Sequence, residues 1–277
     1  MPRPTPETTP RWLLALSASL GEALPRLYGA SADSHLTELI EALTLSLAEG
    51  ELEILLPSAA HRQMLLASPL AADPEGPLVL EGDRVLWRRW FEQRQAVREA
   101  LLQLAAQPLA TAAPTPAALQ ALLERHGVGL DEQQRAAVAA AVQCPLVLLE
   151  GGPGTGKTST VARMLAAAAD HQQGCRIQLA APTGKAAARL RSALGAQGWP
   201  CSTLHRLLES RGERFGRNRS NPLALDLLVI DEVSMLDVPL AAALLEALPA
   251  GARLVLVGDG AQLPPVGERS VLRDLRR

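Results

Sequence analysis

The sequence predicts an α/β protein in two parts: a mainly helical N-terminal domain with a β-hairpin, then a lobe built on a parallel sheet. Two observations lead to this prediction. Leu and Ala recur at helical spacing over 11–28 and 35–49. In the second half, short apolar runs alternate with helical stretches, which is typical of parallel strands covered on both faces. A hydrophobic content of 48% over 277 residues is sufficient for real cores.

A β-hairpin and a linker complete the N-terminal part. Two apolar stretches within 77–90 surround Glu81-Gly82-Asp83, a hairpin pattern, and a helix follows over about 91–107. A Pro/Ala-rich segment then marks the best domain boundary. The predicted organisation is a flexible tail (1–10), an N-terminal domain (11–107), a linker (108–116) and the lobe (117–277).

The lobe contains four candidate strands, PLVLLE, RIQLA, LDLLVIDE and ARLVLVGD. A short helix over about 117–126 precedes them, and helical stretches such as TVARMLAAAADH separate them. Ligands of parallel sheets bind at the carboxyl ends of the strands. Every motif described below falls at such an end.

Composition limits the possible functions. The net charge is −2 and the pI is about 6.2, so nucleic-acid contacts must come from local patches rather than a global basic field. Only Lys157 and Lys185 are lysines among the 27 Lys and Arg residues, and both lie in glycine-containing loops. Three dispersed cysteines suit a reduced, cytoplasmic protein without a disulfide framework. No apolar run approaches membrane-spanning length.

The segment GGPGTGKT, residues 151–158, matches the phosphate-binding loop G-x-x-x-x-G-K-[ST] in full. It follows a predicted strand and opens a predicted helix, the context that the motif requires. The loop backbone and the helix N-terminus are expected to hold the phosphates of ATP, with Lys157 on the β- and γ-phosphates and Thr158 on Mg²⁺. The nucleotide-binding candidates are Gly151, Gly152, Pro153, Gly154, Thr155, Gly156, Lys157, Thr158 and Ser159.

Two adjacent acids end the strand LDLLVIDE. Asp231 is expected to hold Mg²⁺ opposite Thr158, and Glu232 to orient or deprotonate the attacking water. For two adjacent acids considered without other motifs, a solvated turn is the alternative interpretation. With a phosphate loop about 75 residues upstream, the functional interpretation is favoured.

Three further loops carry candidate contacts. Gln262 follows a buried strand, and its amide could sense a γ-phosphate, although ordinary turn chemistry explains the loop equally well. In APTGKAAARL, Lys185 opens a helix that could hold a nucleic-acid phosphate. In STLHRLL, Thr203 and His205 precede another helix in a similar way, and a capping histidine is the alternative. The arginine-rich RGERFGRNRSN (211–221) is more consistent with a solvated loop than with a nucleic-acid contact.

Together these motifs resemble superfamily 1 DNA helicases, and more narrowly the alpha subunit of exodeoxyribonuclease V (RecD-type). LDEQQRAAV resembles the family's Q motif, which implies that Gln134 contacts adenine. GGPGTGKTST, APTGKAAARL, LLVIDEVSMLD and GDGAQLPPV resemble motifs I, Ia, II and III, and STLHRLL resembles the DNA-contact motif that follows Ia. The resemblance covers about 130–270 strongly and 1–115 loosely. The implied DNA contacts are Pro182, Thr183, Lys185, Thr203 and His205.

The resemblance implies one RecA-like P-loop NTPase lobe of a DNA-dependent ATPase that moves 5′→3′ on single strands. In that family the alpha subunit works with beta and gamma chains on DNA ends, in repair of double-strand breaks. The N-terminal domain is implied to dock on the gamma chain, with Trp87, Arg88 and Trp90 either interface anchors or locally packed residues. No nuclease constellation is present, so exonuclease activity is expected in another subunit.

The family's mechanism needs a second α/β lobe, whose arginine fingers typically contribute about 10³–10⁵ in rate. No such lobe is recognised before residue 277. An incomplete gene model or frameshift is favoured over an expression fragment or a natural short protein. This polypeptide alone is therefore expected to bind nucleotide weakly and to turn over negligibly. The competing hypotheses are a non-catalytic binding module of the same complex, another 5′→3′ superfamily 1 DNA helicase, and a small-molecule kinase.

Overall fold

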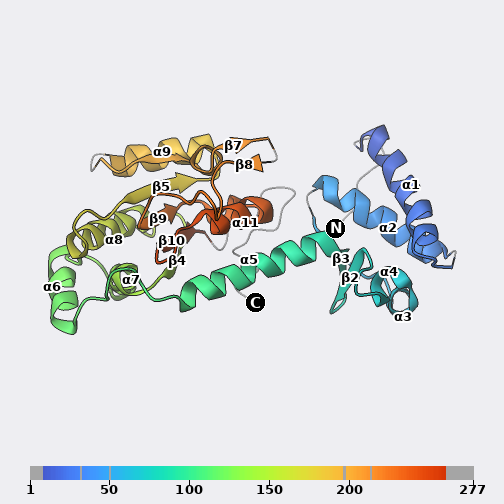
Figure 1. Ribbon diagram of the computed structural model, residues 1–277, viewed down its shortest axis with the longest axis horizontal. Helices are drawn as coiled ribbons and strands as arrows, with labels where there is room; N and C mark the ends of the chain where they lie inside the picture. The colour runs from blue at the N-terminus through green and yellow to red at the C-terminus, as the bar shows by residue number, and fades with distance from the viewer. Residues whose placement is uncertain (1–8, 32, 50, 196–197, 213, 260–277) are drawn as a thin grey trace. The chain divides into compact units, whose positions relative to one another are not determined.

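The computed structural model describes residues 9–259 except 32, 50, 196–197 and 213. The first eight residues of the predicted tail and Gln262 lie outside this range. Two compact units divide between Gln95 and Ala96, inside a helix. The predicted fold class is confirmed: a helical N-terminal part with a small antiparallel sheet precedes a five-stranded parallel sheet (Figure 1).

Two packed helices open the first unit, α1 (Arg11–Leu27) and α2 (Ser34–Ser46), close to their predicted bounds. Gly21 of α1 lies against α2, and a Cβ there would come 3.0 Å from Cγ2 of Thr37. A larger residue would require the Thr37 and Glu41 side chains to shift by a few tenths of an ångström, so glycine suits the close approach of the two helices.

A three-stranded antiparallel sheet, in the order β1-β3-β2, completes this unit. The predicted hairpin is confirmed: Glu81 pairs with Arg84 across a two-residue turn in which Gly82 has φ 62°. The edge strand β1 was not predicted, because three residues give too short an apolar pattern. The remaining elements are η1 (Leu47–Glu49), β1 (Glu53–Leu55), α3 (Ala59–Ala67), α4 (Pro69–Ala72), β2 (Leu78–Glu81) and β3 (Arg84–Trp87).

Two of the proposed interface anchors pack within their own unit. Trp87 is half-buried against the core of α2, α4 and the hairpin. The Arg88 side chain donates to the backbone carbonyls of Asp73 at 3.3 Å and Leu78 at 3.4 Å. Local packing is therefore the observed role of both side chains, while Trp90 is half-buried beneath the guanidinium of Arg89.

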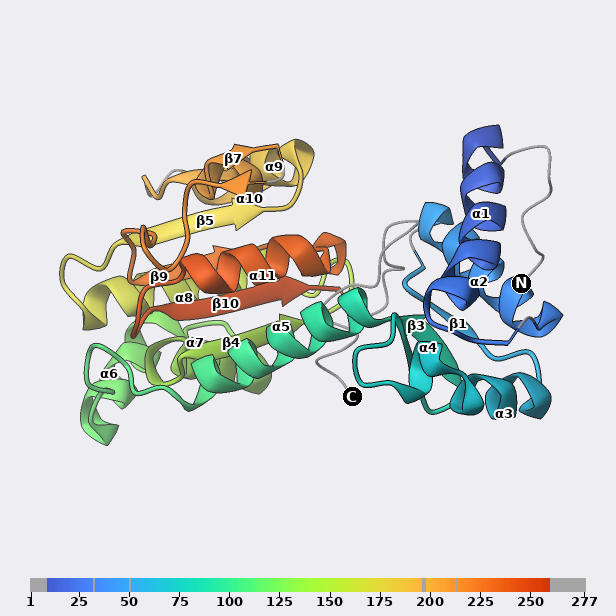
Figure 2. The same cartoon turned by 45° about the vertical axis from the view of Figure 1, so that its right-hand side comes forward.

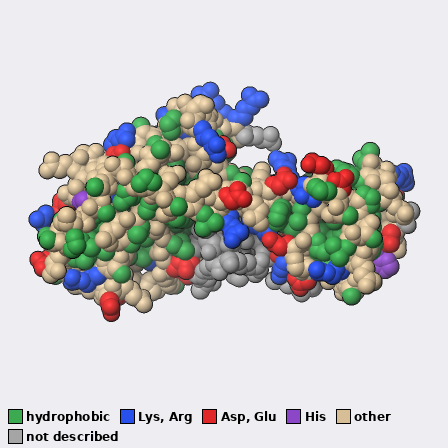
Figure 3. All heavy atoms as spheres, turned by 60° about the horizontal axis from the view of Figure 1, so that its bottom comes forward, with side chains coloured by type: hydrophobic (Ala, Val, Ile, Leu, Met, Phe, Trp, Pro, Cys, Tyr) green, Lys and Arg blue, Asp and Glu red, His purple; other side chains and the backbone are tan. Residues whose placement is uncertain are grey.

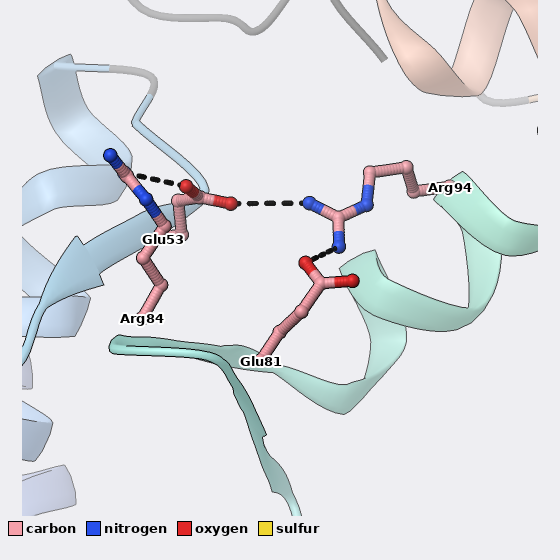
Figure 4. A network of polar contacts seen from close by, with 4 residues as sticks. All are labelled: Glu53, Glu81, Arg84 and Arg94. Carbon is pink, nitrogen blue, oxygen red and sulfur yellow. Dashed lines mark hydrogen bonds and ion pairs between the residues drawn. The ribbon is translucent and has the colours of Figure 1, made fainter. Parts of the chain in front are cut away.

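An ion-pair network fastens this sheet to α5 (Arg88–Ala106) (Figure 4). The carboxylate of Glu53, with 1% of its side chain exposed, accepts from Arg84 at 2.6 Å and from Arg94 at 3.1 Å. Arg94 also pairs with Glu81. Because Glu53 is buried, its charge depends on these two arginines for compensation.

The second unit holds the parallel sheet, in the order β4-β10-β9-β5-β6. Alternate strand residues such as Val147, Val229 and Val255 form one core with α7 and α8. Figure 2 shows α11 in front of strands β9 and β10. The elements after α5 are α6 (Pro116–His126), α7 (Glu132–Gln143), β4 (Leu146–Glu150), α8 (Lys157–His171), β5 (Ile177–Ala181), α9 (Gly184–Leu194), β6 (Cys201–Thr203), α10 (Leu204–Leu207), β7 (Ser210–Arg211), β8 (Arg214–Phe215), β9 (Leu227–Ile230), η3 (Val233–Met235), α11 (Val238–Ala247) and β10 (Arg253–Gly258).

The strand register brings the strand ends to one edge of the sheet. Leu148 of β4 and Ile230 of β9 both pair with Leu256 of β10, which lies between them. On the other side, Ala181 of β5 pairs with Thr203 of β6. The strand β6 is additional to the four predicted strands, because its three residues, Cys-Ser-Thr, carry no apolar run.

The described surface matches the near-zero net charge. On the face shown in Figure 3, acidic and basic side chains lie interspersed.

Among the described helices, none combines the length and the apolar character needed to cross a bilayer.

The buried position of Glu53 leads to a stability prediction. Glu53→Ala should lower the free energy of unfolding by about 3–5 kcal/mol, because it removes the counter-charge that Arg84 and Arg94 share and leaves Arg94 with Glu81. Urea unfolding followed by tryptophan fluorescence checks this, since Trp12, Trp87 and Trp90 all lie in this unit.

The matched control is Glu22→Ala, which removes an exposed pair with Arg26 at 3.6 Å. That change should cost less than about 1 kcal/mol. Equal losses for the two variants would contradict the role assigned to Glu53.

Candidate functional site

The loop between β4 and α8 has the geometry of a phosphate cradle. Gly154 and Gly156 both have φ 77°, the left-handed region that glycine adopts without strain. Gly156 is the N-cap of α8 and has no side chain, so no side chain caps that helix N-terminus. The first-turn N–H groups of α8 are therefore available to bind an anion.

Lys157 lies over this loop. Its half-buried ammonium donates to the carbonyl oxygens of Gly151 at 2.5 Å and Gly152 at 2.8 Å. Thr155 Oγ1 donates to Gly152 O at 2.9 Å, which tightens the same turn. Thr158, the predicted metal ligand, is exposed on the first turn of α8. Pro153 and Ser159 are also exposed, and Ser159 Oγ donates to Gly156 O at 2.7 Å.

Gln134 braces the loop from α7. Its Oε1 accepts from the Asp131 N–H at 3.2 Å and its Nε2 donates to the Thr155 carbonyl at 3.2 Å. The first bond completes a capping box, because the Asp131 carboxylate accepts from the Gln134 N–H at 2.8 Å. Gln134 therefore lies beside the loop, and its contact with adenine stays a prediction.

Asp231 follows β9 at the same sheet edge. Its N–H donates to Ala180 O at 3.0 Å, and its Oδ1 accepts from the Glu232 N–H at 2.9 Å. Burial raises the pKa of Asp231 above its usual value, while the Glu232 N–H and the charges of Lys157 and Arg189 oppose that rise. The influence of Lys157 indicates that this carboxyl and the loop share one electrostatic environment.

Glu232 combines an unusual backbone with an ion pair. Its φ is 55°, a left-handed conformation that costs a residue with a side chain about 1–3 kcal/mol. Its Oε1 lies 3.2 Å from Nη1 of Arg189, on α9. Sequence reasoning did not identify Arg189, although its place four residues after Lys185 was an available clue.

The predicted nucleic-acid contacts lie at the ends of β5 and β6. Thr183 and Thr203 are the N-caps of α9 and α10, and their hydroxyls accept from the Ala186 N–H at 3.2 Å and the Arg206 N–H at 3.3 Å. Pro182 is half-buried, whereas Lys185 and His205 are exposed at these helix starts. The structure therefore brings all five side chains to two neighbouring strand ends, next to the end of β9 that carries Asp231.

The arginine-rich segment forms the small β7–β8 hairpin. Arg217 pairs with Glu209 at 2.7 Å and donates to Asn221 Oδ1 at 3.3 Å. This local use of Arg217 agrees with a solvated segment rather than a basic platform.

The residues present fit a magnesium nucleotide. Mg²⁺ keeps several waters and is held by one or two protein oxygens together with substrate phosphates. Thr158 and Asp231 supply two oxygens at one sheet edge. Within the described part of the chain there is no group of three or more His, Cys, Asp or Glu side chains arranged for a metal ion.

Comparisons with known proteins agree with this site. A family model described as an AAA domain matches residues 134–268, which implies nucleotide binding. The RecBCD enzyme subunit RecD of Mycobacterium tuberculosis is 43% identical over 230 residues, 76% of this chain and 38% of that protein. This chain is a RecD homologue. RecD of Mycolicibacterium smegmatis is 42% identical over 233 residues, 76% of this chain and 40% of the relative.

The RecD likeness is partial in length. The chain spans 38% of the Mycobacterium tuberculosis RecD that it matches. The ATP-dependent RecD2 DNA helicase of Deinococcus radiodurans is 46% identical over 138 residues, 50% of this chain and 19% of that protein. Among solved structures, the Pif1 helicase of Candida albicans matches at 21% identity with a TM-score of 0.38, covering 54% of this chain and 38% of that chain.

The two acids that flank β9, Asp231 and Asp226, have pKa shifts of opposite direction, which leads to a pair of predictions. Asp231 has a raised pKa, so its ionisation destabilises the fold as the pH rises above the unfolded value of about 3.9. Asp231→Asn should therefore raise the melting temperature at pH 7 in EDTA, and the gain should vanish near pH 4.

Asp226→Asn is the matched control with the opposite sign. The Arg176 side chain, 2.7 Å away, lowers the pKa of Asp226, so its carboxylate stabilises the fold above the unfolded pKa and loses that effect in acid. The substitution should lower the melting temperature at pH 7. Thermal denaturation of both variants at pH 4 and pH 7 checks the pair, and shifts of the same sign would contradict it.

Proposed function

We propose that this chain is the ATP-driven motor portion of a 5′→3′ DNA helicase subunit that acts on single strands at DNA ends during recombinational repair. One observation carries the proposal: a single sheet edge bears the phosphate cradle after β4, the half-buried Asp231 after β9 and, on the adjoining strands β5 and β6, a cluster of exposed basic and helix-capping side chains. A small-molecule kinase would instead need an acceptor pocket where Lys185 and His205 are exposed.

In this proposal the nucleotide is held by residues 151–159. Lys157 exchanges its contacts with the Gly151 and Gly152 carbonyls for the β- and γ-phosphates. Thr158 and Asp231 hold Mg²⁺, which when bound neutralises charge developing on the phosphates. Glu232 orients the attacking water, and Gln262 senses the γ-phosphate.

Single-stranded DNA occupies the neighbouring strand ends. Lys185 supplies a compact positive charge at the N-terminus of α9, and a phosphate there also meets the favourable end of the helix dipole. His205 and Thr203 contact the next part of the backbone. Such contacts position a strand without reading its sequence, as translocation requires.

The partners follow from the RecD likeness. The relatives carry the name RecBCD enzyme subunit, so we propose a cytoplasmic complex with the beta and gamma chains, in which another chain supplies the nuclease. The N-terminal unit docks on gamma. With Trp87 and Arg88 packed internally, α1 offers the better surface, because Trp12 and Leu27 are 67% and 77% exposed.

Two lysine variants test the separation of the nucleotide and DNA sites. Lys157→Ala should weaken binding of a fluorescent Mg·ADP analogue by roughly 10- to 150-fold, the effect of removing a charged hydrogen-bond donor. It should leave binding of a thymidine homopolymer, measured without nucleotide, unchanged. Lys185→Ala should weaken binding of the thymidine homopolymer and leave binding of the Mg·ADP analogue unchanged. It should also reduce, by about 0.7, the slope of log DNA affinity against log salt concentration.

Each variant is the control for the other, and both are measured in the complete protein that carries this sequence. DNA should also stimulate ATP hydrolysis by the unaltered protein. ATP consumption that is indifferent to DNA, or equal loss of both ligands in both variants, would overturn the proposed function.

A further inference from the structure

The Arg189–Glu232 ion pair joins the two halves of the proposed site. Glu232 follows the half-buried Asp231 in the loop after β9, whereas Arg189 belongs to α9, which begins beside Lys185. Nη1 of Arg189 lies 3.2 Å from Oε1 of Glu232. Among the described residues, this side-chain contact links the acid pair to the helix that carries the proposed DNA contact.

The ion pair between Arg189 and Glu232 is weak, so another anion can displace the carboxylate from the guanidinium. The Arg189 side chain is 66% exposed and the Glu232 side chain 20% exposed, and a single hydrogen bond joins them. An ion pair with so exposed a partner shifts an equilibrium by no more than about five-fold. The pair therefore adds little to the stability of the fold, and a second anion near Arg189 can compete for its guanidinium.

The positions of Lys185 and Arg189 on α9 indicate where such an anion would bind. Lys185 and Arg189 are four residues apart, so they lie on one face of α9, with Cβ atoms about 5–6 Å apart. A phosphate backbone drawn to Lys185 comes within reach of the guanidinium. Phosphate oxygens form bidentate, charge-assisted bonds with arginine and are strong competitors of one singly bonded carboxylate oxygen.

We propose that Arg189 is a positioning residue that couples single-stranded DNA to ATP hydrolysis through Glu232. Without DNA, Arg189 holds the Glu232 carboxylate towards α9 and away from the attacking water. When a DNA phosphate engages Lys185 and Arg189, the carboxylate is released to orient that water. This inference rests on the proposed function, and it assigns the DNA dependence of hydrolysis to one side-chain exchange.

The test compares ATP hydrolysis by the complete protein with and without a thymidine homopolymer. Arg189→Ala should raise the DNA-free rate roughly 2- to 5-fold, because Glu232 is no longer restrained. The stimulation by saturating DNA should fall by the same factor, since the maximal rate changes little. Arg189→Lys, which keeps the charge but not the forked geometry, should restore part of the restraint.

Two controls distinguish a specific role from a structural one. Arg191→Ala removes an equal charge from the same helix, where Arg191 donates to Cys201 O at 2.8 Å, and should leave the DNA-free rate unchanged. Binding of the Mg·ADP analogue should be equal in the unaltered and Arg189→Ala proteins, which verifies folding. If Arg189→Ala fails that check, Arg189→Gln replaces it with the same expected outcomes.

The outcomes separate this inference from the proposed function. An unaltered protein that hydrolyses ATP without DNA stimulation overturns the proposed function. A DNA-stimulated protein in which the Arg189 variants lower both rates, or leave the ratio unchanged, retains the proposed function and overturns the role of Arg189.

Discussion

The parallel register of the five-stranded sheet is the constraint on which the site depends. Pairing of Leu256 with both Leu148 and Ile230 fixes where β4 and β9 end, and pairing of Ala181 with Thr203 does the same for the neighbouring strands. Adjacent strands lie about 4.8 Å apart, so the loops after β4 and β9, two strands apart, are separated by about 10 Å. A magnesium nucleotide spans that distance, and every candidate side chain in the described lobe lies along this one edge.

Asp231 and Glu232 are both held in energetically unfavourable local conformations or environments. Asp231 is drawn out of water at the end of a fully buried strand, and its pKa rises for that reason. Glu232 adopts a left-handed backbone conformation at the next position. Both features oppose folding, whereas Asp226, at the other end of the same strand, is well paired with Arg176. Unfavourable local features that the rest of a fold supports are typical of functional positions.

The sequence predicted the parts of this lobe that have strong local patterns. The long apolar strands, the glycine loop with Lys157, and the acids after β9 were all identifiable, because their residue types are dictated by burial or by phosphate geometry. The short strands β1 and β6 escaped prediction, since three residues carry too little pattern. The Arg189–Glu232 contact was also missed, because it depends on how α9 packs against β5, the strand that pairs with β9. Trp87 and Arg88 left two options open from sequence, and the contacts with the hairpin core and nearby carbonyls favour local packing.

A double-mutant cycle on magnesium-dependent nucleotide affinity tests the central claim most directly. The affinities of the unaltered chain, Thr158→Ala, Asp231→Asn and the double variant for ADP would be measured with Mg²⁺ and again in EDTA. If both side chains hold one ion, each single change weakens binding only when Mg²⁺ is present, and the double variant loses clearly less than the sum of the two. Losses that persist in EDTA, or that add fully, would contradict a shared magnesium site at this edge of the sheet.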